Sequence, residues 1–262
     1  MGINIRHCLG SLVLGFALFS ATASAQTTSQ GSTADKDDEG IQWSLGGGVV
    51  ASPRPYVGTD AKVIPIPAVG LRYKRWFVQG IRGGFDVLQK GPFTGSLFAQ
   101  ARFRGLEPES SPFLEGMQPR KKSADGGGEF VYQGRPVGFR AAFVSDILGR
   151  SKGQEVSLLA VTGAPLGRVL VLVGAGPRWL SSNRVDYYYG VRNEEVRPGR
   201  PGFQGRATWN LDINLTVRVK LAENWSLFTL VNREGFGSGI TDSPLVDQSA
   251  GYSMITSLTY DF

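Results

Sequence analysis

The chain has 262 residues, and its 28 Lys and Arg residues against 22 Asp and Glu residues give a formal net charge of +6 at pH 7. These charges are spread along the chain rather than packed into one block, so we expect no nucleic-acid partner. Beyond residue 25, no run reaches the roughly 18 apolar residues of a transmembrane helix, which excludes a helical membrane protein but not a soluble or membrane-embedded β-protein.

Residues 1–25 have the pattern of a secretory signal peptide. Arg6 supplies a positive charge, residues 9–19 form an apolar run, and Ala23, Ser24 and Ala25 form a small-residue cleavage site. The run of about 11 residues is too short to cross a bilayer as a helix. Nothing before it could cover it as a buried core helix, so we predict export and cleavage after Ala25. The polar residues 26–40 are predicted to form a flexible periplasmic linker.

The segment 207–220 has the clearest strand pattern of the chain. Its apolar positions are Ala207, Trp209, Leu211, Ile213, Leu215, Val217 and Val219, and its polar positions are Thr208, Asn210, Asp212, Asn214, Thr216, Arg218 and Lys220. The pattern therefore has the two-residue period of a strand rather than the 3.6-residue period of a helix. One wholly apolar face fits either a soluble β-sandwich or a barrel whose outer face contacts lipid.

The last segment favours the barrel. Phe262, Tyr260 and Leu258 share one face of the predicted strand 252–262, and polar residues share the other. A terminal aromatic residue on such a strand resembles the signal by which outer-membrane barrels are recognised for assembly. A strand that closes the barrel also removes the open edge that lipid does not tolerate. The alternative is a soluble protein that ends in Phe, but the predicted export favours an assembly signal at these three residues.

We therefore predict an all-β fold for residues 41–262: a transmembrane antiparallel β-barrel in the outer membrane of a Gram-negative-type bacterium, with about ten strands, twelve being the second choice. The predicted strands are 41–50, 62–73, 75–88, 93–104, 130–144, 153–163, 167–180, 207–220, 224–232 and 252–262.

With N- and C-termini in the periplasm, ten strands place most of the long joins outside, as barrels prefer. These joins are 51–61, 145–152, 181–206 and 233–251. The join 105–129 falls on the periplasmic side despite its length. This indicates either a real periplasmic feature or a miscounted strand within residues 75–104.

Four short stretches stand out in chain order. The first contains Pro55, Tyr56, Gly58 and Asp60 and continues to Pro65 and Pro67; the second is Leu114, Glu115, Gly116 and Met117 with Arg120; the third contains Tyr188 and Gly190; the fourth contains Ser243 and Pro244. As an ordered set, they resemble the MipA/OmpV family of MltA-interacting outer-membrane proteins, over nearly the whole expected mature chain.

The resemblance implies an outer-membrane barrel. It also implies partners, since one class of the family is described as a scaffold between a lytic transglycosylase and a peptidoglycan synthase. Other members are described as porin-like or adhesion-linked. Our main hypothesis is a structural or interaction protein that uses periplasmic joins such as 105–129, and the alternative is a porin-like channel for small solutes.

Catalysis is not expected. His7 and Cys8 are the only histidine and cysteine, and both lie in the predicted signal peptide, so the mature chain lacks the usual general base and thiolate. We expect no enzyme activity, no cofactor and no metal. Glu194 and Glu195 are interpreted as surface charges in an arginine-rich loop, and Asp212 as part of an ion-pair network inside the barrel.

Two further groups suggest contacts with the membrane. The five tryptophans lie at or near predicted strand ends, which favours an interfacial girdle over core packing: they are Trp43, Trp76, Trp179, Trp209 and Trp225. Five arginines surround the loop before strand 207–220, where phosphates of lipopolysaccharide are a possible partner and simple solvation the alternative: they are Arg184, Arg192, Arg197, Arg200 and Arg206. Outer-membrane lipid and lipopolysaccharide are thus expected partners.

Overall fold

The computed structural model describes residues 40–52 and 55–262. The predicted signal peptide and all of the predicted linker except Gly40 lie outside the described residues, so both stay predictions.

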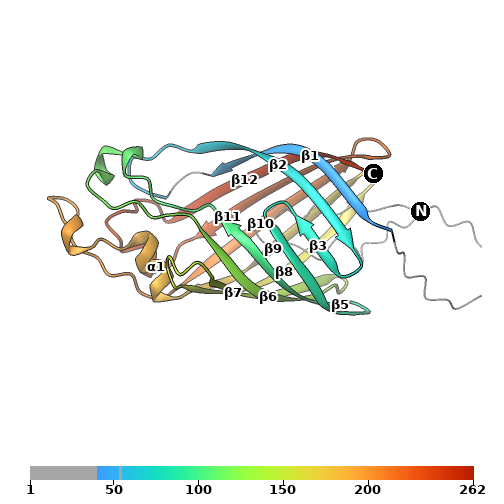
Figure 1. The fold of residues 1–262 in the computed structure, drawn as a ribbon, viewed down its shortest axis with the longest axis horizontal. Helices are drawn as coiled ribbons and strands as arrows, with labels where there is room; N and C mark the ends of the chain where they lie inside the picture. Colours follow the sequence, from blue (N-terminus) through green and yellow to red (C-terminus); the bar gives the residue numbers. More distant parts are fainter. Residues whose placement is uncertain (1–39, 53–54) are drawn as a thin grey trace, which may run out of the picture.

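The described chain forms a closed barrel of twelve antiparallel strands, each paired with its neighbours in sequence, and β1 paired with β12 (Figure 1). The strands are β1 (Gln42–Ser52), β2 (Lys62–Tyr73), β3 (Trp76–Gln79), β4 (Arg82–Lys90), β5 (Phe93–Arg102), β6 (Ser123–Tyr132), β7 (Val137–Asp146), β8 (Gln154–Leu166), β9 (Val169–Leu180), β10 (Thr208–Lys220), β11 (Trp225–Gly235) and β12 (Ala250–Asp261). The helices α1 (Ser182–Tyr189) and α2 (Ser238–Thr241) lie in the connections.

The predicted barrel is confirmed, but the predicted count of about ten strands is wrong. The segment 75–88 is a hairpin of β3 and β4, which reverses at Gly80, where the positive φ of 56° suits a residue without a Cβ. The segment 130–144 belongs to two strands, because β6 begins at Ser123. The start of β6 was not predicted because the three consecutive glycines at 126–128 have low strand propensity. In the structure these glycines pair with β5 and β7.

With twelve strands, the long segment 105–129 no longer falls among the short turns. The described chain begins at Gly40 and ends at Phe262, both at one end of the barrel, called here the terminus end, together with the five short turns 74–75, 91–92, 133–136, 167–168 and 221–224. The connecting residues 55–61, 103–122, 147–153, 181–207 and 236–249 lie at the opposite end, called the loop end. The long segment within 105–129 therefore lies with the other long loops rather than on the side of the termini, which confirms the second alternative, a miscounted strand within residues 75–104.

Strand β10 shows which face meets lipid. Its apolar side chains point outward, with Trp209 59% and Leu211 48% exposed, whereas the polar side chains of Asn210 and Asp212 point inward and are 3% and 4% exposed. A soluble sandwich would bury the apolar face and expose the polar one. The inverse arrangement is that of a barrel in a membrane.

Aromatic side chains gather at both ends of the outer surface. At the terminus end, Trp43 stacks on Phe262 with ring centroids 3.6 Å apart, and Tyr260 meets Trp225 edge-on at 5.2 Å. At the loop end, Trp209 lies opposite Trp179 in the pairing of β10 with β9. These positions fit the predicted girdle. No helix among the described residues is long and apolar enough to span a membrane.

Candidate functional site: the loop cap and the charged lumen

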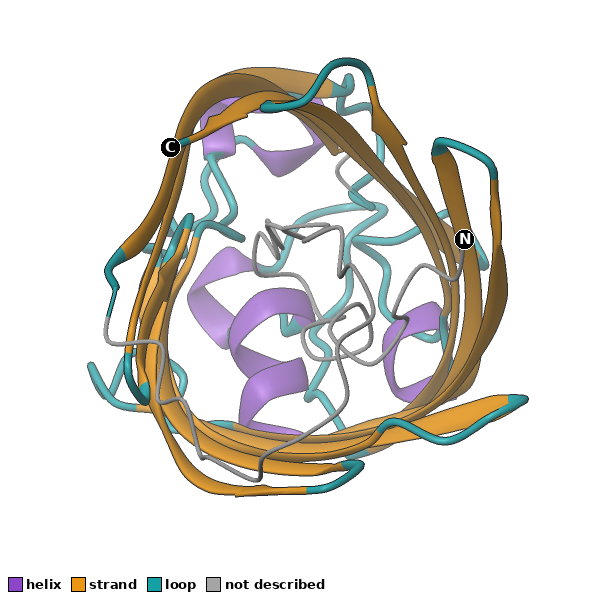
Figure 2. Ribbon diagram, turned by 90° about the vertical axis from the view of Figure 1, so that its right-hand side faces the viewer, coloured by secondary structure: helices purple, strands orange, loops and turns teal. Residues whose placement is uncertain are grey.

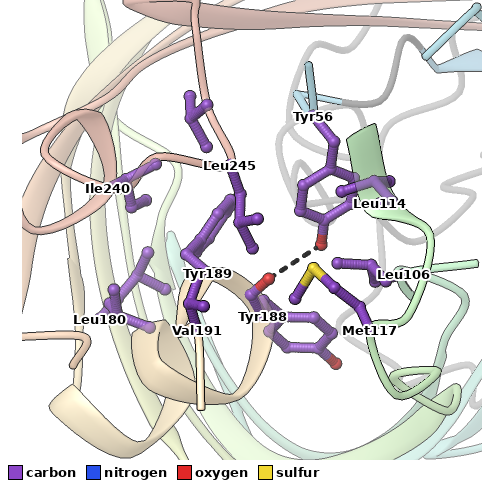
Figure 3. Packing of buried hydrophobic residues seen from close by; sticks show 12 residues of the cluster. Tyr56, Leu106, Leu114, Met117, Leu180, Tyr188, Tyr189, Val191, Ile240 and Leu245 are labelled. Atoms are coloured by element: carbon purple, nitrogen blue, oxygen red, sulfur yellow. Dashed lines mark hydrogen bonds between the residues drawn. The ribbon is translucent and has the colours of Figure 1, made fainter. Parts of the chain in front are cut away.

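Four of the connections at the loop end pack together over the barrel interior, and we call this assembly the loop cap. Viewed along the barrel, helices and loops lie within the ring of strands (Figure 2). The cap has its own apolar core, which Figure 3 shows from close by. Its buried residues are Tyr56, Leu106, Leu114, Met117, Leu180, Val185, Tyr188, Tyr189, Val191, Ile240, Leu245 and Val246. The core packs these four loops against one another at the loop end.

All four resembling motifs contribute to this core, the second through Leu114 and Met117, and hydrogen bonds join the other three. The Tyr56 hydroxyl donates a hydrogen bond to the carbonyl oxygen of Tyr188 at 3.2 Å (Figure 3). The Ser243 hydroxyl donates to the carbonyl oxygen of Tyr189 at 2.6 Å. Tyr56 also forms an isolated β-bridge with Val246. Side chains that are more than 50 residues apart in sequence thus hold three loops together.

Burial raises the pKa of three tyrosine hydroxyls in this core. Desolvation raises the pKa of Tyr56 far above its usual value of 10.0, and the nearby Tyr189 adds to the effect. Burial likewise raises the pKa of Tyr188 and of Tyr189. These hydroxyls therefore stay protonated at physiological pH. Those of Tyr56 and Tyr189 form hydrogen bonds, whereas the buried Tyr188 hydroxyl has no partner among the described residues.

The remaining motif residues have different surroundings. Gly58 is exposed and has a φ of 67°, which an L side chain adopts only with strain, and Gly190 is buried where α1 ends. Asp60 is exposed. Pro65 and Pro67 lie in β2 and are exposed, away from the cap core. The sequence resemblance therefore combined cap residues with residues of the barrel wall.

A buried ion pair, which the sequence did not reveal, joins two loops of the cap. Both oxygens of Glu195 accept hydrogen bonds from the Arg120 guanidinium at 2.8 Å, and one also accepts from the backbone N–H of Gln118 at 2.9 Å. Arg192 donates its backbone N–H to the other oxygen at 3.0 Å. Glu195 is 1% exposed, so its interpretation as a surface charge is wrong, while Glu194 is exposed as expected.

These contacts decide the ionisation of Glu195. Burial alone would raise its pKa, but the hydrogen bonds from Arg120 and from the backbone of Arg192 and Gln118 outweigh burial and lower the pKa from 4.5 to about 2. The carboxylate therefore stays charged at neutral pH and keeps residues 103–122 joined to residues 181–207.

The arginine-rich loop is divided between inside and outside. The buried guanidinium of Arg200 donates to the carbonyl oxygens of Glu195, Phe113 and Glu115, and Arg184 is buried against Asp125. Arg192, Arg197 and Arg206 are exposed. The expected contact with lipopolysaccharide is thus restricted to these three, of which Arg206 forms an exposed ion pair with Asp242 at 2.8 Å.

Below the cap, the lumen is crossed by ion pairs between side chains of different strands. Glu129 lies between Arg82 and Arg140, and Arg102 lies between Asp125 and Glu155 at 2.5 and 3.0 Å. This set continues through Arg178, which contacts Asp212, Glu155 and Glu234 at 2.5, 3.6 and 4.0 Å. The predicted internal network at Asp212 is confirmed, with Arg178 as its partner. Paired charges of this kind tie neighbouring and nearby strands of the wall together on the lumen side.

Arg104 connects the cap with this network. Its guanidinium donates to the Tyr189 hydroxyl at 3.2 Å and to Glu234 at 3.0 Å. Arg104 therefore contacts both the cap and the lumen network, as Arg184 of α1 does through Asp125. Within residues 40–52 and 55–262, no three or more His, Cys, Asp or Glu side chains are grouped to hold a metal ion.

A family model and several curated relatives place the chain in the same family. The family model described as "MltA-interacting protein MipA" matches residues 45–262. The MltA-interacting protein of Escherichia coli (strain K12) is 26% identical over 229 residues, covering 84% of this chain and 90% of that protein. The outer membrane protein OmpV of Vibrio cholerae is 23% identical over 178 residues, covering 68% of this chain and 67% of that protein.

Solved structures that resemble the chain are outer-membrane barrels. An outer membrane channel from Pseudomonas putida F1 has a TM-score of 0.43 and 11% identity, covering 88% of this chain and all of that one (100%). The NanC porin has a TM-score of 0.38 and 7% identity, covering 84% of this chain and 100% of that one. The names of the relatives, which are outer membrane proteins, confirm the predicted location in the outer membrane.

Proposed function

Because this chain belongs to the MipA family of MltA-interacting proteins and forms an outer-membrane β-barrel, we propose that it is a structural interaction protein that holds a lytic transglycosylase at the outer membrane. A peptidoglycan synthase is the second partner in this proposal, and the barrel itself carries out no catalysis.

The closed loop end is the observation that carries the proposal. The cap core is almost fully buried, with Leu106, Leu114, Val185, Ile240 and Leu245 at 0% exposure. A mouth filled by a packed core, above a lumen crossed by buried ion pairs, does not suit a diffusion channel for small solutes. It suits a rigid anchor that presents its surface to a partner.

The partner surface in this proposal is the terminus end, with both termini in the periplasm. Short periplasmic turns and longer outer loops are the usual arrangement in such barrels. Each of the five turns at this end carries or adjoins a cation: they are Lys74, Arg75, Lys90, Arg135, Arg168 and Lys220. Among the described residues, only Glu223 and Asp261 are acidic there. Such a surface favours a partner with an acidic face.

Binding measurements on the barrel in lipid nanodiscs test the proposal. We expect a purified lytic transglycosylase to bind, and binding to weaken when four exposed terminus-end cations are neutralised in K74Q/K90Q/R135Q/R168Q. The matched control neutralises four exposed loop-end cations in K121Q/R150Q/K152Q/R197Q. Absence of binding by the unaltered barrel would overturn the proposal, and equal weakening by both variants would overturn the assignment of the terminus end.

Planar-bilayer recordings test the alternative. The anchor proposal expects no reproducible single-channel steps from the purified barrel. Steps of constant conductance would favour the porin-like channel instead.

A further inference from the structure

The barrel wall is not continuously paired. Strand β2 has 12 residues and pairs with β1 from Lys62 to Arg72. On its other side it pairs with β3, which has only four residues, so that ladder covers Gly70–Tyr73 alone. The remaining β2 residues, 62–69, have no strand partner on this side within the described chain, and only the Val69 carbonyl is bonded, to the Gly80 N–H at 2.7 Å. In Figure 1, β2 continues well beyond the short β3 toward the loop end.

This unpaired edge of β2 lies at membrane depth. Ala51 of β1 pairs with Val63 on one side and with Met254 of β12 on the other. Met254 is two residues inside Tyr252, an exposed aromatic residue near the loop end. Register therefore puts the edge from Val63 to Val69 between the level of the loop-end aromatic residues and the middle of the apolar band.

The sequence of the edge fits the absence of a neighbouring strand. Backbone groups of an antiparallel strand point alternately to its two sides. Since the Val69 carbonyl points away from β1, the backbone groups of residues 67, 65 and 63 also point away from β1. Positions 65 and 67 are both proline, which has no N–H, so two of the donors that would otherwise face lipid do not exist. Prolines here also make the edge a poor template for an added strand.

The interruption has defined borders. The β3–β4 turn at Gly80 borders it toward the terminus end. Toward the loop end, the Lys62 ammonium contacts Glu107 of the cap at 3.5 Å. On the far side, β4 and β5 begin their pairing at Arg82 and Gln100.

Apolar side chains lie behind the interruption. Ile64, Ile66 and Ala68 point into the lumen by alternation, and Ala68 belongs to an apolar cluster of inward-facing residues with Leu172, Leu230 and Ile255, against which Ile66 packs. Ile64 is 37% exposed although it points inward, whereas the inward-facing Ile255, in the fully paired strand β12, is 6% exposed. Ile64 is therefore less covered than a lumen-facing isoleucine in a fully paired strand.

We propose that this interruption is a lateral docking site for the acyl chain of a membrane amphiphile, which enters the wall beside residues 62–69 of β2, on the loop-end side of the β3–β4 turn, and contacts Ile64 and Ile66. An acyl chain accepts no hydrogen bonds, so the two missing donors do not disfavour it, whereas two carbonyls of an added strand would stay unbonded. Lys62 stands at the loop end of the site, where a phosphate head group is a suitable partner. The site is independent of the anchor function proposed above.

Fluorescence quenching by brominated phospholipid tests the site in the intact barrel. Single-cysteine variants I64C, I255C and L215C, made in a C8S background, are labelled with bimane and reconstituted in phosphatidylcholine vesicles. The outward-facing L215C should be quenched strongly by dibrominated chains and I255C hardly at all. We expect I64C to be quenched several-fold more than I255C. Protection of I64C equal to that of I255C would overturn the proposal, as would quenching of I64C by aqueous iodide but not by brominated lipid.

Lipid retention provides a second measurement that needs no label. After detergent extraction, we expect the barrel to keep a stoichiometric phospholipid that the variant I64Q/I66Q loses. The matched control L172Q/L230Q alters two lumen-facing residues of the same cluster in fully paired strands and should keep the lipid. Heat-modifiable migration on gels shows that each variant is folded. An unaltered barrel without retained lipid, or loss of lipid from both variants, would contradict the site.

Discussion

Arg120 and Glu195 meet through two hydrogen bonds of 2.8 Å inside the loop cap, and both side chains are almost fully buried. The pair joins residues 103–122 to residues 181–207, two of the connections that close the loop end. Arg120 also donates to the carbonyl oxygens of Tyr187 and Gly190, so the guanidinium organises the backbone around the tyrosine-rich helix α1 as well. The pair therefore holds two cap loops and the end of α1 together.

Replacing Arg120 with methionine should loosen the cap. The variant leaves the Glu195 carboxylate buried without its charged partner, and breaking such a pair from one side costs about 3–5 kcal/mol. We expect faster proteolysis within 103–122 and 181–207, while the barrel strands stay protected. The double variant R120M/E195L should recover much of the protection, because no charge is left buried, and E194Q serves as an exposed control. Equal proteolysis of the single and double variants would contradict the explanation.

Acid should release the cap through Glu195. The pKa of this carboxyl is about 2 in the folded cap and 4.5 in its ordinary state. A lowered pKa means that its contribution to stability is complete above about pH 4.5 and is lost as pH falls toward 2. Hydrogen exchange at the amides of Gln118 and Arg192, which donate to the carboxylate, measures this directly. In E195Q, the increase in hydrogen exchange as pH falls from about 4.5 toward 2 should disappear. If the increase persists, it arises from other carboxylates.

The stack of Phe262 on Trp43 predicts an assembly defect. Phe262 also donates its backbone N–H to the Trp43 carbonyl at 3.1 Å, so the last residue is tied to the first strand where the barrel closes. F262A should lower the folded fraction in cells several-fold, measured by heat-modifiable migration, and should change spontaneous refolding into vesicles much less. F139A removes another exposed aromatic residue and is the control. Normal assembly of F262A would count against the signal at Phe262, Tyr260 and Leu258.

The barrel could be predicted because the alternation of apolar and polar residues in its strands reflects the lipid on one face and the lumen on the other. The alternation along 207–220 and the aromatic residues near the C-terminus report lipid on one face and a polar lumen on the other, and both features follow from local pattern. The predicted number of strands was wrong where the alternation of apolar and polar residues was weakest. Gly80 turns a short hairpin within one apparent strand, and the glycines 126–128 carry no side chains to alternate.

The cap could not be predicted in the same way, because its contacts join distant residues. Tyr56 and Tyr188 are 132 residues apart, and Arg120 and Glu195 are 75 apart. No period links such positions, and Glu195 has the same sequence surroundings as its exposed neighbour Glu194. The resemblance to a family pointed to Tyr56, Tyr188 and Ser243, but only the structure brings them together.

The two prolines of β2 allow a direct test of how the unpaired edge is protected. P65V/P67V supplies two N–H donors on the side of β2 that lacks a strand, at membrane depth where an unpaired donor is costly. Pairing with a second barrel through the same edge satisfies these donors, so we expect the double variant to form dimers in detergent and in vesicles, detected by cross-linking and sedimentation. P92V, which alters an exposed proline in a terminus-end turn, should stay monomeric. If P65V/P67V is folded and as monomeric as P92V, the missing donors are not what keeps the edge from pairing, and the cover must come from groups other than the backbone.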